Sequence, residues 1–191
     1  ADHLQAIAPV LGDGVLAAVN GLILPQRTLF IADTQVHADP DPATLATIAQ
    51  RAADAVRCFD LVPRIAFVSD DGLEAPESPV TQKMLAAAHA FRALGTGVEA
   101  EGGVGVALAL SGELRGRLTP DSRLSADANL IVMSNKDLAH MASSLLMASG
   151  GEGVTVGPIL LGTTKPAHIL TASATVRRIV NLTVLAVASA D

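Results

Sequence analysis

Few residues of this sequence lie at spacings that a known catalytic motif requires. The segment GTGVEA at residues 95–100 matches a loose dinucleotide-binding pattern, but it follows a predicted helix, whereas that pattern needs a strand leading into a helix. No G-x-S-x-G nucleophile motif occurs, although a Ser/His/Asp triad could still assemble in space. No two histidines are spaced to share a helical turn, so we expect no metal site. The five histidines are His3, His37, His89, His140 and His168.

Two pairs of acidic residues could act as paired carboxylates or as a ligand site. Asp39 and Asp41 each precede a proline, and Asp41 is well placed to cap the helix that follows, which favours a structural role. Asp70 and Asp71 open an acidic loop after a predicted strand, where α/β proteins bind ligands. Because this loop lacks a basic partner, we interpret it as a solvated turn.

The composition is typical of a packed domain of helices and strands. The chain has 191 residues, and half of them are apolar, many being Ala and Val. A net charge of -6 and the absence of Trp and Tyr argue against nucleic acid as a partner. No apolar run reaches the roughly 18 residues that a membrane-spanning helix needs, which argues against a membrane protein.

Cys58 is the single cysteine, so the chain cannot form an internal disulfide. It lies between Val56 and Phe59 on the apolar side of a predicted helix, and we expect a buried, unreactive thiol. The first residues, ADHL, lack the basic and apolar regions of a signal peptide, so a cytoplasmic location is expected. They also lack an initiator Met, which suggests a fragment or a processed chain.

Short apolar runs alternate with segments of helical periodicity along the chain. The predicted strands span residues 28–33, 65–68, 128–133 and 154–161. The predicted helices span residues 41–60, 78–94, 108–118 and 135–148, and a last one begins near Ser173. This alternation predicts an α/β fold of three layers, in which a mainly parallel sheet carries helices on both faces. Residues 70–77 and 95–105 form the least regular stretches.

Apolar residues at three- and four-residue steps predict which face of each helix is buried. In the helix of residues 78–94 they are Met84, Leu85, Ala88, Phe91 and Leu94. Asn135 is the expected cap of the next long helix, whose inward residues are predicted to be Leu138, Met141, Leu145 and Leu146. The apolar residues of the last helix are Val176, Ile179, Val180, Val184 and Val187.

The run from Gly157 to Asn181 (GPILLGTTKPAHILTASATVRRIVN) resembles the C-terminal signature of the phosphotransacetylase-like domain of bacterial hybrid NADP-dependent malic enzymes. Residues 22–45 and 128–130 resemble earlier blocks of that domain, in the same order. The resemblance implies the phosphotransacetylase fold, related to that of isocitrate and isopropylmalate dehydrogenases, here incomplete at its N-terminus. It also implies that residues 1–150 form the central lobe, that residues 151–191 return to the other lobe, and that a malic enzyme catalytic domain lies upstream as a partner.

Several polar residues that the family uses for acetyl transfer are replaced in this chain. The Ser-Arg pair of the active enzymes falls on Thr171 and Ala172, an aspartate falls on Arg177 or Arg178, and an arginine falls on Ser149. Three family loops have also changed, at residues 69–75, 101–107 and 134–142. Because transfer between two anionic substrates needs fixed cations and hydrogen-bond donors, the resemblance implies a chain that is not catalytic.

Three functions remain open at this point. The first is a non-catalytic domain that binds acetyl-CoA and regulates or assembles an NADP-dependent malic enzyme, while a separate region decarboxylates malate to pyruvate. The second is a working phosphate acetyltransferase, in which Thr171, Ser173, Lys165 and the arginines Arg177 and Arg178 replace the usual site. The third is a structural oligomerisation module without a ligand.

A site for acetyl-CoA or CoA is expected where the turn of residues 162–166 meets the start of the last helix. A helix N-terminus suits the phosphates of CoA, and Lys165 adds a positive charge. The expected ligand-binding residues are Asn135, Lys165, Thr171, Ser173 and Arg177. The alternative is that Ser173 is only a helix cap and Lys165 only a solvated residue. Self-association into a homo-oligomer is expected through the helices of residues 41–60 and 78–94.

Overall fold

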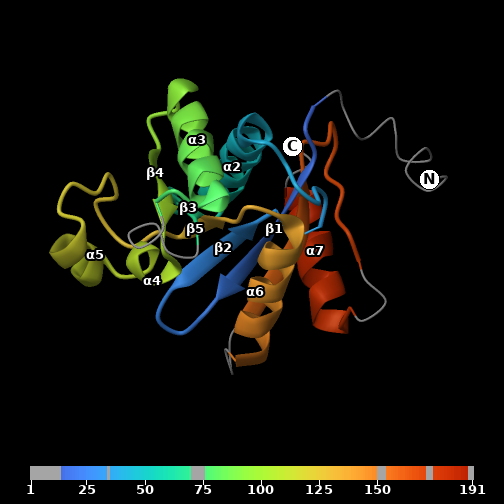
Figure 1. The fold of residues 1–191 in the computed structure, drawn as a ribbon. Helices are drawn as coiled ribbons and strands as arrows, with labels where there is room; N and C mark the ends of the chain where they lie inside the picture. The colour runs from blue at the N-terminus through green and yellow to red at the C-terminus, as the bar shows by residue number, and fades with distance from the viewer. Residues whose placement is uncertain (1–13, 34, 70–75, 150–153, 171–173, 189–191) are drawn as a thin grey trace.

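A six-stranded sheet with helices on both faces forms the fold (Figure 1). The computed structural model of the chain describes residues 14–33, 35–69, 76–149, 154–170 and 174–188. The strands are β1 (Ala17–Ile23), β2 (Thr28–Ala32), β3 (Arg64–Val68), β4 (Glu99–Val104), β5 (Leu130–Val132) and β6 (Val154–Leu161). The helices are α2 (Pro42–Arg57), α3 (Pro79–Ala93), α4 (Val106–Ala109), α5 (Gly112–Leu118), α6 (Lys136–Ser149) and α7 (Val176–Ala188). The predicted three-layer α/β fold is therefore confirmed.

The sheet order is β4-β3-β5-β2-β1-β6. Strands β2, β5, β3 and β4 are parallel neighbours, whereas β1 runs antiparallel to both β2 and β6, so the sheet is mixed with a parallel majority of pairs. One row of paired residues crosses the sheet, and its members are Ile159, Val19, Ala32, Val132 and Phe67. The carboxyl ends of β3, β5, β2 and β6 consequently lie at one edge of the sheet.

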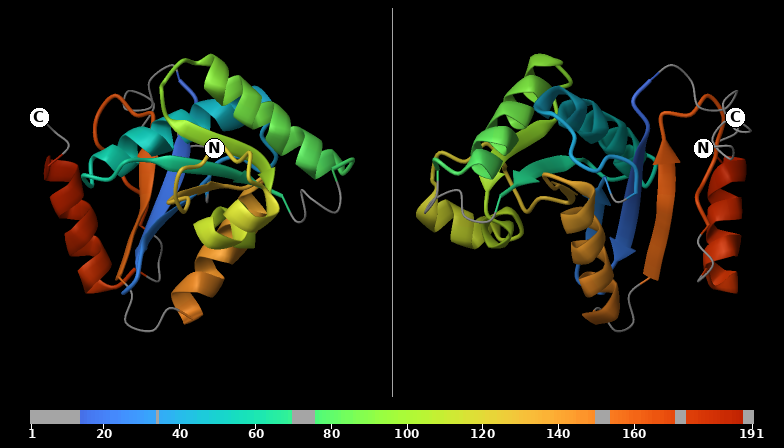
Figure 2. Two further views of the ribbon diagram at one scale, coloured as in Figure 1. Left: turned by 90° about the vertical axis from the view of Figure 1, so that its left-hand side faces the viewer. Right: turned by 45° about the vertical axis from the view of Figure 1, so that its right-hand side comes forward.

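Helices cover both faces of the sheet (Figure 2), and each face carries its own apolar core. Residues of α2 and α3, together with Leu182 of α7, pack on one face around Phe30 and Phe67. Residues of α4 and α6 pack on the other face, where Leu108 and Ala139 contribute to the core. No helix among the described residues is both long and apolar enough to cross a membrane.

Two strands were not predicted from the sequence. Strand β1 (AAVNGLI) contains Asn and Gly, which are depleted in strands. Strand β4 contains Gly102 and Gly103, in the stretch that was predicted to be irregular. A Cβ atom on Gly102 would lie 2.5 Å from the carbonyl oxygen of Met84, so the glycine allows α3 to lie directly on β4. Strand β6 matches the predicted residues 154–161 and continues through Gly157 and Pro158.

Helix α2 begins where the sequence predicts, but the environment of Cys58 at its C-terminal end differs from the prediction. The Asp41 side chain accepts a hydrogen bond from the Thr44 backbone N–H at 2.7 Å, and Pro42 is the first helical residue. The prediction of a buried Cys58 is wrong, because its side chain is exposed. Since successive helical residues turn by about 100°, Cys58 at the C-cap points nearly opposite to the buried Val56.

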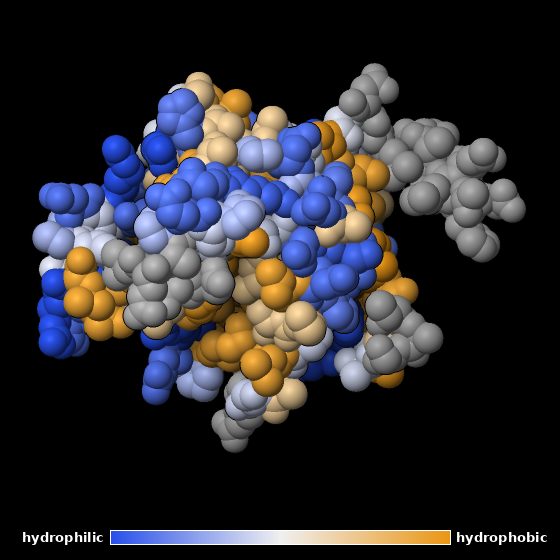
Figure 3. All heavy atoms as spheres, viewed as in Figure 1, coloured by the Kyte–Doolittle hydropathy of each residue, from blue (hydrophilic) through white to orange (hydrophobic). Residues whose placement is uncertain are grey.

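The predicted inward face of α6 is wrong for three of its four residues. Leu138, Met141 and Leu145 are exposed, whereas Leu146 is partly buried against the core, and Ala139 and Ser143 are the buried residues of the helix. Figure 3 shows apolar side chains gathered on the surface over α6. The longest apolar residues of this helix therefore mark an open surface, because small residues form its contact with the sheet.

The other predicted helices are present with different boundaries, but the apolar face predicted for the last helix is exposed, and Leu182 is its buried residue. In α3 Met84, Ala88 and Phe91 are buried, but Leu85 and Leu94 are exposed. The single helix predicted over residues 108–118 is two short helices, α4 and α5, because Ser111 caps a new start. The last helix is capped by Thr175, whose hydroxyl oxygen accepts from the Arg178 backbone N–H at 3.3 Å. Ser173 lies outside the described residues.

Candidate functional site

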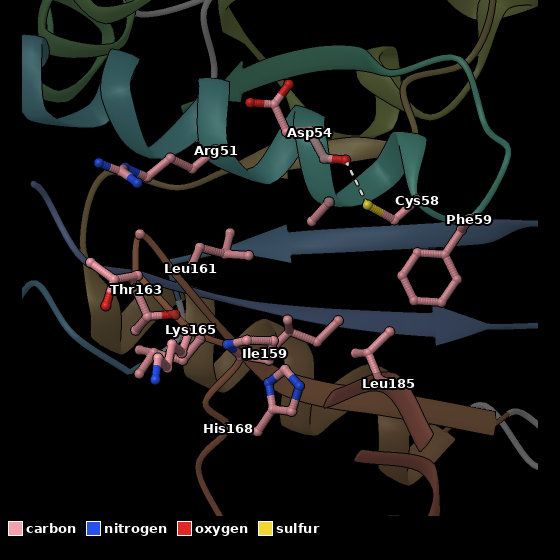
Figure 4. Close-up of a pocket in the computed structure, with 15 residues that line it drawn as sticks. Arg51, Asp54, Cys58, Phe59, Ile159, Leu161, Thr163, Lys165, His168 and Leu185 are labelled. Atoms are coloured by element: carbon pink, nitrogen blue, oxygen red, sulfur yellow. Dashed lines mark hydrogen bonds between the residues drawn. The ribbon is translucent and has the colours of Figure 1, made fainter. Parts of the chain in front are cut away.

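A pocket of about 350 Å³ lies between α2 and the segment that follows β6 (Figure 4). We call it the basic pocket, because Arg51 and Lys165 line it. In Figure 4 Arg51, Thr163 and Lys165 lie toward one end, and Phe59 and Leu185 lie toward the other. Its lining residues are Arg51, Asp54, Ala55, Cys58, Phe59, Ile159, Leu160, Leu161, Gly162, Thr163, Thr164, Lys165, Pro166, His168 and Leu185. The pocket thus has a cationic end and an apolar end.

Arg51 is held at its position by the glycine turn after β6. A Cβ atom on Gly162, whose φ is +85°, would lie 2.8 Å from Nη1 of Arg51 and 2.6 Å from the carbonyl oxygen of Val15. The Nε atom of Arg51 is buried without a hydrogen-bond partner, and no carboxylate of the described residues forms an ion pair with this guanidinium. Arg51 is therefore a fixed cation whose charge is available to an anion.

Asp54, the carboxylate among the pocket residues, does not neutralise Arg51. Its side chain points away from the pocket in Figure 4, and its Oδ1 atom lies 2.5 Å from Nη1 of Arg57. Lys165 is exposed at the rim of the pocket. Two cations therefore line this cavity, and neither forms an ion pair with a carboxylate of the described residues.

His168 contributes an uncharged polar group to the same pocket. Both ring nitrogens are buried and lack hydrogen-bond partners in the described part of the chain. Burial lowers the pKa of this imidazole, because desolvation disfavours the charged form. The backbone of His168 forms an antiparallel bridge with Ile159, which fixes the ring beside β6. A neutral imidazole offers one donor and one acceptor, so this ring can bind a polar ligand group.

A second pocket of about 360 Å³ lies at the carboxyl ends of β3 and β5. We call it the apolar pocket, and its lining residues are Val68, Ser69, Val80, Val106, Met133, Ser134 and Leu138. The hydroxyl oxygen of Ser69 is buried and has no hydrogen-bond partner among the residues that the structure describes. Lys83 lies nearby, but its Nζ atom already contacts Asp39 Oδ1 at 2.5 Å and the Ser134 carbonyl oxygen at 2.8 Å.

The residues predicted to bind a ligand are placed in different parts of the structure. Asn135 caps α6, where its Oδ1 atom accepts a hydrogen bond from the Leu138 backbone N–H at 2.9 Å. Lys165 lines the basic pocket, whereas Arg177 is exposed in the first turn of α7. Thr171 and Ser173 lie outside the described residues.

The structure also separates the turn of residues 162–166 from the start of α7. Arg178, in the first turn of α7, donates from Nε to the Gly157 carbonyl oxygen at 2.7 Å, in the middle of β6. Leu185, two turns later, is the α7 residue that lines the basic pocket with Lys165. Figure 1 shows the chain running from the end of β6 back along the strand before α7 begins.

Sequence reasoning did not single out Arg51 or His168 as ligand-binding residues. Arg51 lies on a regular amphipathic helix, and no local motif distinguishes it from a solvated arginine. His168 lies within the run of residues 157–181 that carries the family resemblance, but its place beside β6 comes from a backbone bridge with Ile159 that forms only in the fold. No group of three or more metal-ligating side chains is found among the described residues.

The architecture is that of an α/β domain built on a mixed six-stranded sheet. The phosphate acetyl/butaryl transferase family matches residues 1–187, and the chain belongs to this family. The chain is 40% identical over 194 residues to an NADP-dependent malic enzyme of Escherichia coli, with all of this chain and 26% of the relative covered. It is 33% identical to a phosphate acetyltransferase of Paracoccus denitrificans, covering 95% of this chain and 59% of that relative.

Solved structures of phosphotransacetylases have the same fold. The phosphotransacetylase of Streptococcus pyogenes superposes with a TM-score of 0.85 at 24% sequence identity, covering 94% of this chain and 55% of that one. The EutD phosphotransacetylase of Staphylococcus aureus superposes with a TM-score of 0.86 and is covered to 58%. The predicted phosphotransacetylase fold is therefore confirmed, and the chain spans little more than half of these proteins.

Proposed function

We propose that this chain is the phosphotransacetylase-like part of an NADP-dependent malic enzyme, where it binds acetyl-CoA and does not catalyse acetyl transfer. The alignment with the C-terminal region of malic enzymes supports the fusion. In this proposal the oxidative decarboxylation of malate belongs to a separate region of the longer protein. Acetyl-CoA then regulates that reaction if it binds one of two assembly states more tightly than the other.

The contact of Arg178 is the observation that carries the non-catalytic part of this proposal. The family aspartate near the start of the last helix falls on Arg177 or Arg178, and a guanidinium cannot accept a proton from a substrate. Arg178 instead donates a hydrogen bond to the Gly157 carbonyl oxygen, so it joins α7 to β6. In this proposal the family aspartate corresponds to Arg178, whose side chain makes a structural contact in this chain.

The basic pocket supports the binding of the phosphorylated end of CoA. Arg51 and Lys165 supply two positive charges for phosphate groups, and Arg suits phosphate because its donors form a planar fork. His168 adds a hydrogen-bonding group, and Phe59 supplies an apolar surface for a ring. A cavity of about 350 Å³ is at the small end of ligand pockets, so it accommodates part of acetyl-CoA.

Calorimetric titration of acetyl-CoA into the full-length malic enzyme tests this proposal. Arg51→Ala and Lys165→Ala should each weaken binding by about 10-fold or more, because each removes a charge-assisted hydrogen bond. Arg117→Ala is the control, since this exposed arginine on α5 lies in neither pocket. Absence of heat at millimolar acetyl-CoA, or an equal loss in all three variants, would contradict the proposal.

An assembly role is a second candidate function, and the exposed apolar residues of α6 and α7 favour it. Leu145 is 68% exposed and Val184 is 62% exposed, which is uncommon for large apolar side chains on regular helices. Self-association through α2 and α3 remains a prediction. Helix α2 has no exposed large apolar side chain, whereas α3 has Val80 and Leu85. Light scattering on the full-length protein, which measures its mass, tests the assembly role.

A further inference from the structure

The imidazole ring of His168 is a polar group that has no protein partner in the described part of the chain. Both of its nitrogens are buried and form no hydrogen bond there. The antiparallel bridge between His168 and Ile159 involves the backbone alone, so it holds the ring beside β6 without satisfying it. Because buried polar groups in folded proteins almost always have a hydrogen-bond partner, this ring has a capacity that a ligand in the basic pocket can fill.

Two cations share the pocket with this ring. Arg51 enters it from α2, and Lys165 enters it from the turn after β6. In the view of Figure 4 the imidazole lies between Lys165 and Leu185, where the cationic end of the pocket meets the apolar end. Neither cation forms an ion pair with a carboxylate of the described residues. An imidazolium would add a third positive charge to this pocket, and a bound anion would compensate it.

The other titratable groups near the ring do not supply that anion. The Asp54 carboxylate is bound to Arg57, and the Cys58 thiol donates to the Asp54 carbonyl oxygen at 3.4 Å. Strands β1 and β6 contain no titratable residue. On α7, Arg178 donates to a backbone carbonyl of β6, and Arg177 is exposed. Since no described residue supplies a negative charge to the ring, we expect that charge to come from a ligand.

The charge of the ring should depend on whether an anion lies beside it. Burial lowers the pKa of His168 in the folded chain, so the ring is neutral at pH 7. A phosphate oxygen within about 4 to 6 Å raises this pKa again, because it stabilises the imidazolium form. At a pH between the two pKa values, the ring takes up a proton when the phosphate binds.

We propose that His168 binds the phosphate of a ligand as an imidazolium, taking one proton from the solvent as the phosphate enters the basic pocket, so that the affinity for the ligand rises as pH falls. This inference rests on the proposed function and adds a pH dependence to it. A buffer molecule gives up the proton, a ring nitrogen gains it, and no other bond forms or breaks. The affinity increases by at most about 10-fold for each pH unit, because a single proton is linked to binding.

Calorimetric titration of acetyl-CoA into the full-length protein tests this inference. At pH 6.5, the difference in heat between two buffers of unequal ionisation enthalpy gives the number of protons taken up for each ligand bound. His168→Asn keeps a polar side chain that cannot be protonated, so it should take up about 0.5 proton fewer than the unaltered protein. His89→Asn, at an exposed position on α3, is the matched control and should behave like the unaltered protein. The phosphate monoester of the ligand itself titrates at about pH 6, and the comparison removes its contribution because all three proteins bind the same ligand.

The pH dependence of the dissociation constant is a second measurement. Between pH 7.5 and pH 5.5 the affinity of the unaltered protein should rise about 10-fold relative to that of His168→Asn. His168→Gln repeats the comparison with a longer side chain, which guards against a local change caused by the shorter one. Equal proton uptake in the unaltered protein and both variants, or a constant ratio of their affinities, would overturn this inference and leave the proposed function intact, since the ligand still binds. Absence of acetyl-CoA binding to the unaltered protein overturns both.

Discussion

The Nδ1 atom of His37 lies 2.8 Å from Oδ2 of Asp33, at the carboxyl end of β2. Asp33 is buried, and its carboxylate also accepts hydrogen bonds from the backbone N–H groups of Ala18 at 2.8 Å and of His37 at 3.0 Å. The N–H groups of Gln35 and Val36 approach Oδ1 at 3.3 Å. This single carboxylate joins β1, β2 and the following loop, on the edge where both pockets open.

Asp33→Ala is expected to destabilise the fold by about 3 kcal/mol, because several buried N–H groups lose their acceptor. His37→Ala removes one donor of several and should cost about 1 kcal/mol. Urea unfolding followed by circular dichroism measures both values. Asp121→Ala, at an exposed position, is the control and should stay within about 0.5 kcal/mol. Equal midpoints for Asp33→Ala and Asp121→Ala would show that the carboxylate is dispensable.

Gly162→Ala is expected to destabilise the chain and to displace Arg51. The new methyl group would lie 2.6 Å from the Val15 carbonyl oxygen, at a φ of +85° that L residues rarely adopt. A cost of about 1 to 3 kcal/mol follows from this strain, and acetyl-CoA binding should weaken with it. Gly116→Ala is the matched control, because no atom lies within 4 Å of its added methyl group and α5 favours alanine. Similar unfolding midpoints for the two variants would contradict the prediction.

The buried ring of His168 should make stability depend on pH. Its pKa in the fold is lowered from 6.5 by desolvation, so the unfolded chain binds the proton more readily. The contribution of the neutral ring is therefore complete above pH 6.5 and is lost as pH falls through the lower pKa of the folded state. His168→Asn, which cannot be protonated, should show a smaller loss of urea midpoint between pH 7.5 and pH 5 than the unaltered protein. The same slope in both proteins would refute the assignment to His168.

The sequence was sufficient to predict elements whose pattern is local. Asp41 and Pro42 predict the start of α2, and the apolar run of residues 28–33 predicts β2, because capping and strand burial depend on neighbouring residues. It was not sufficient for β4, whose glycines serve the close approach of α3. Nor could periodicity reveal that α6 contacts the sheet through Ala139 and Ser143. These features depend on the partner that an element meets in three dimensions.

The candidate site was less predictable than the fold for the same reason. Lys165 was singled out because of its sequence context, and it does line a pocket. Arg51 joins that pocket from α2, more than a hundred residues away, through the contact with Gly162. The hydroxyl of Ser69 has no partner among the described residues, at the place where β3 and β5 end side by side. Neither of these two juxtapositions can be recognised from the spacing of residues in the sequence.

The protein is expected to show no acetyl transfer between acetyl phosphate and CoA. Loss of one oriented stabilising group typically lowers a rate by about 10²- to 10³-fold, and several such groups are replaced. A coupled assay with acetyl phosphate and CoA measures this activity in the full-length protein, and a phosphotransacetylase of the same family serves as the positive control. A turnover number near 10 per second, which is ordinary for enzymes, would contradict the non-catalytic proposal.

Helix α7 presents a stripe of valines that no described residue covers. Val176, Val180, Val184 and Val187 are 78%, 53%, 62% and 68% exposed, and their three- and four-residue spacing places them on one face. Leu182, on the opposite face, is buried against the sheet. The chain spans 26% of its malic enzyme relatives. If the chain is part of a longer malic enzyme, as proposed above, residues of the rest of that protein would cover this stripe.

Val184→Glu is therefore expected to destabilise the full-length protein by about 3 kcal/mol or more, since it places an unpaired charge in a buried contact. In the isolated 191-residue chain, where Val184 is exposed, the same change should alter stability by no more than about 0.5 kcal/mol. Leu94→Glu, at an exposed apolar position beyond α3, is the control. Light scattering on the same samples distinguishes coverage within one chain from coverage by a second copy, because only the latter lowers the mass. An equally small effect of Val184→Glu in both proteins would show that the stripe stays exposed to solvent.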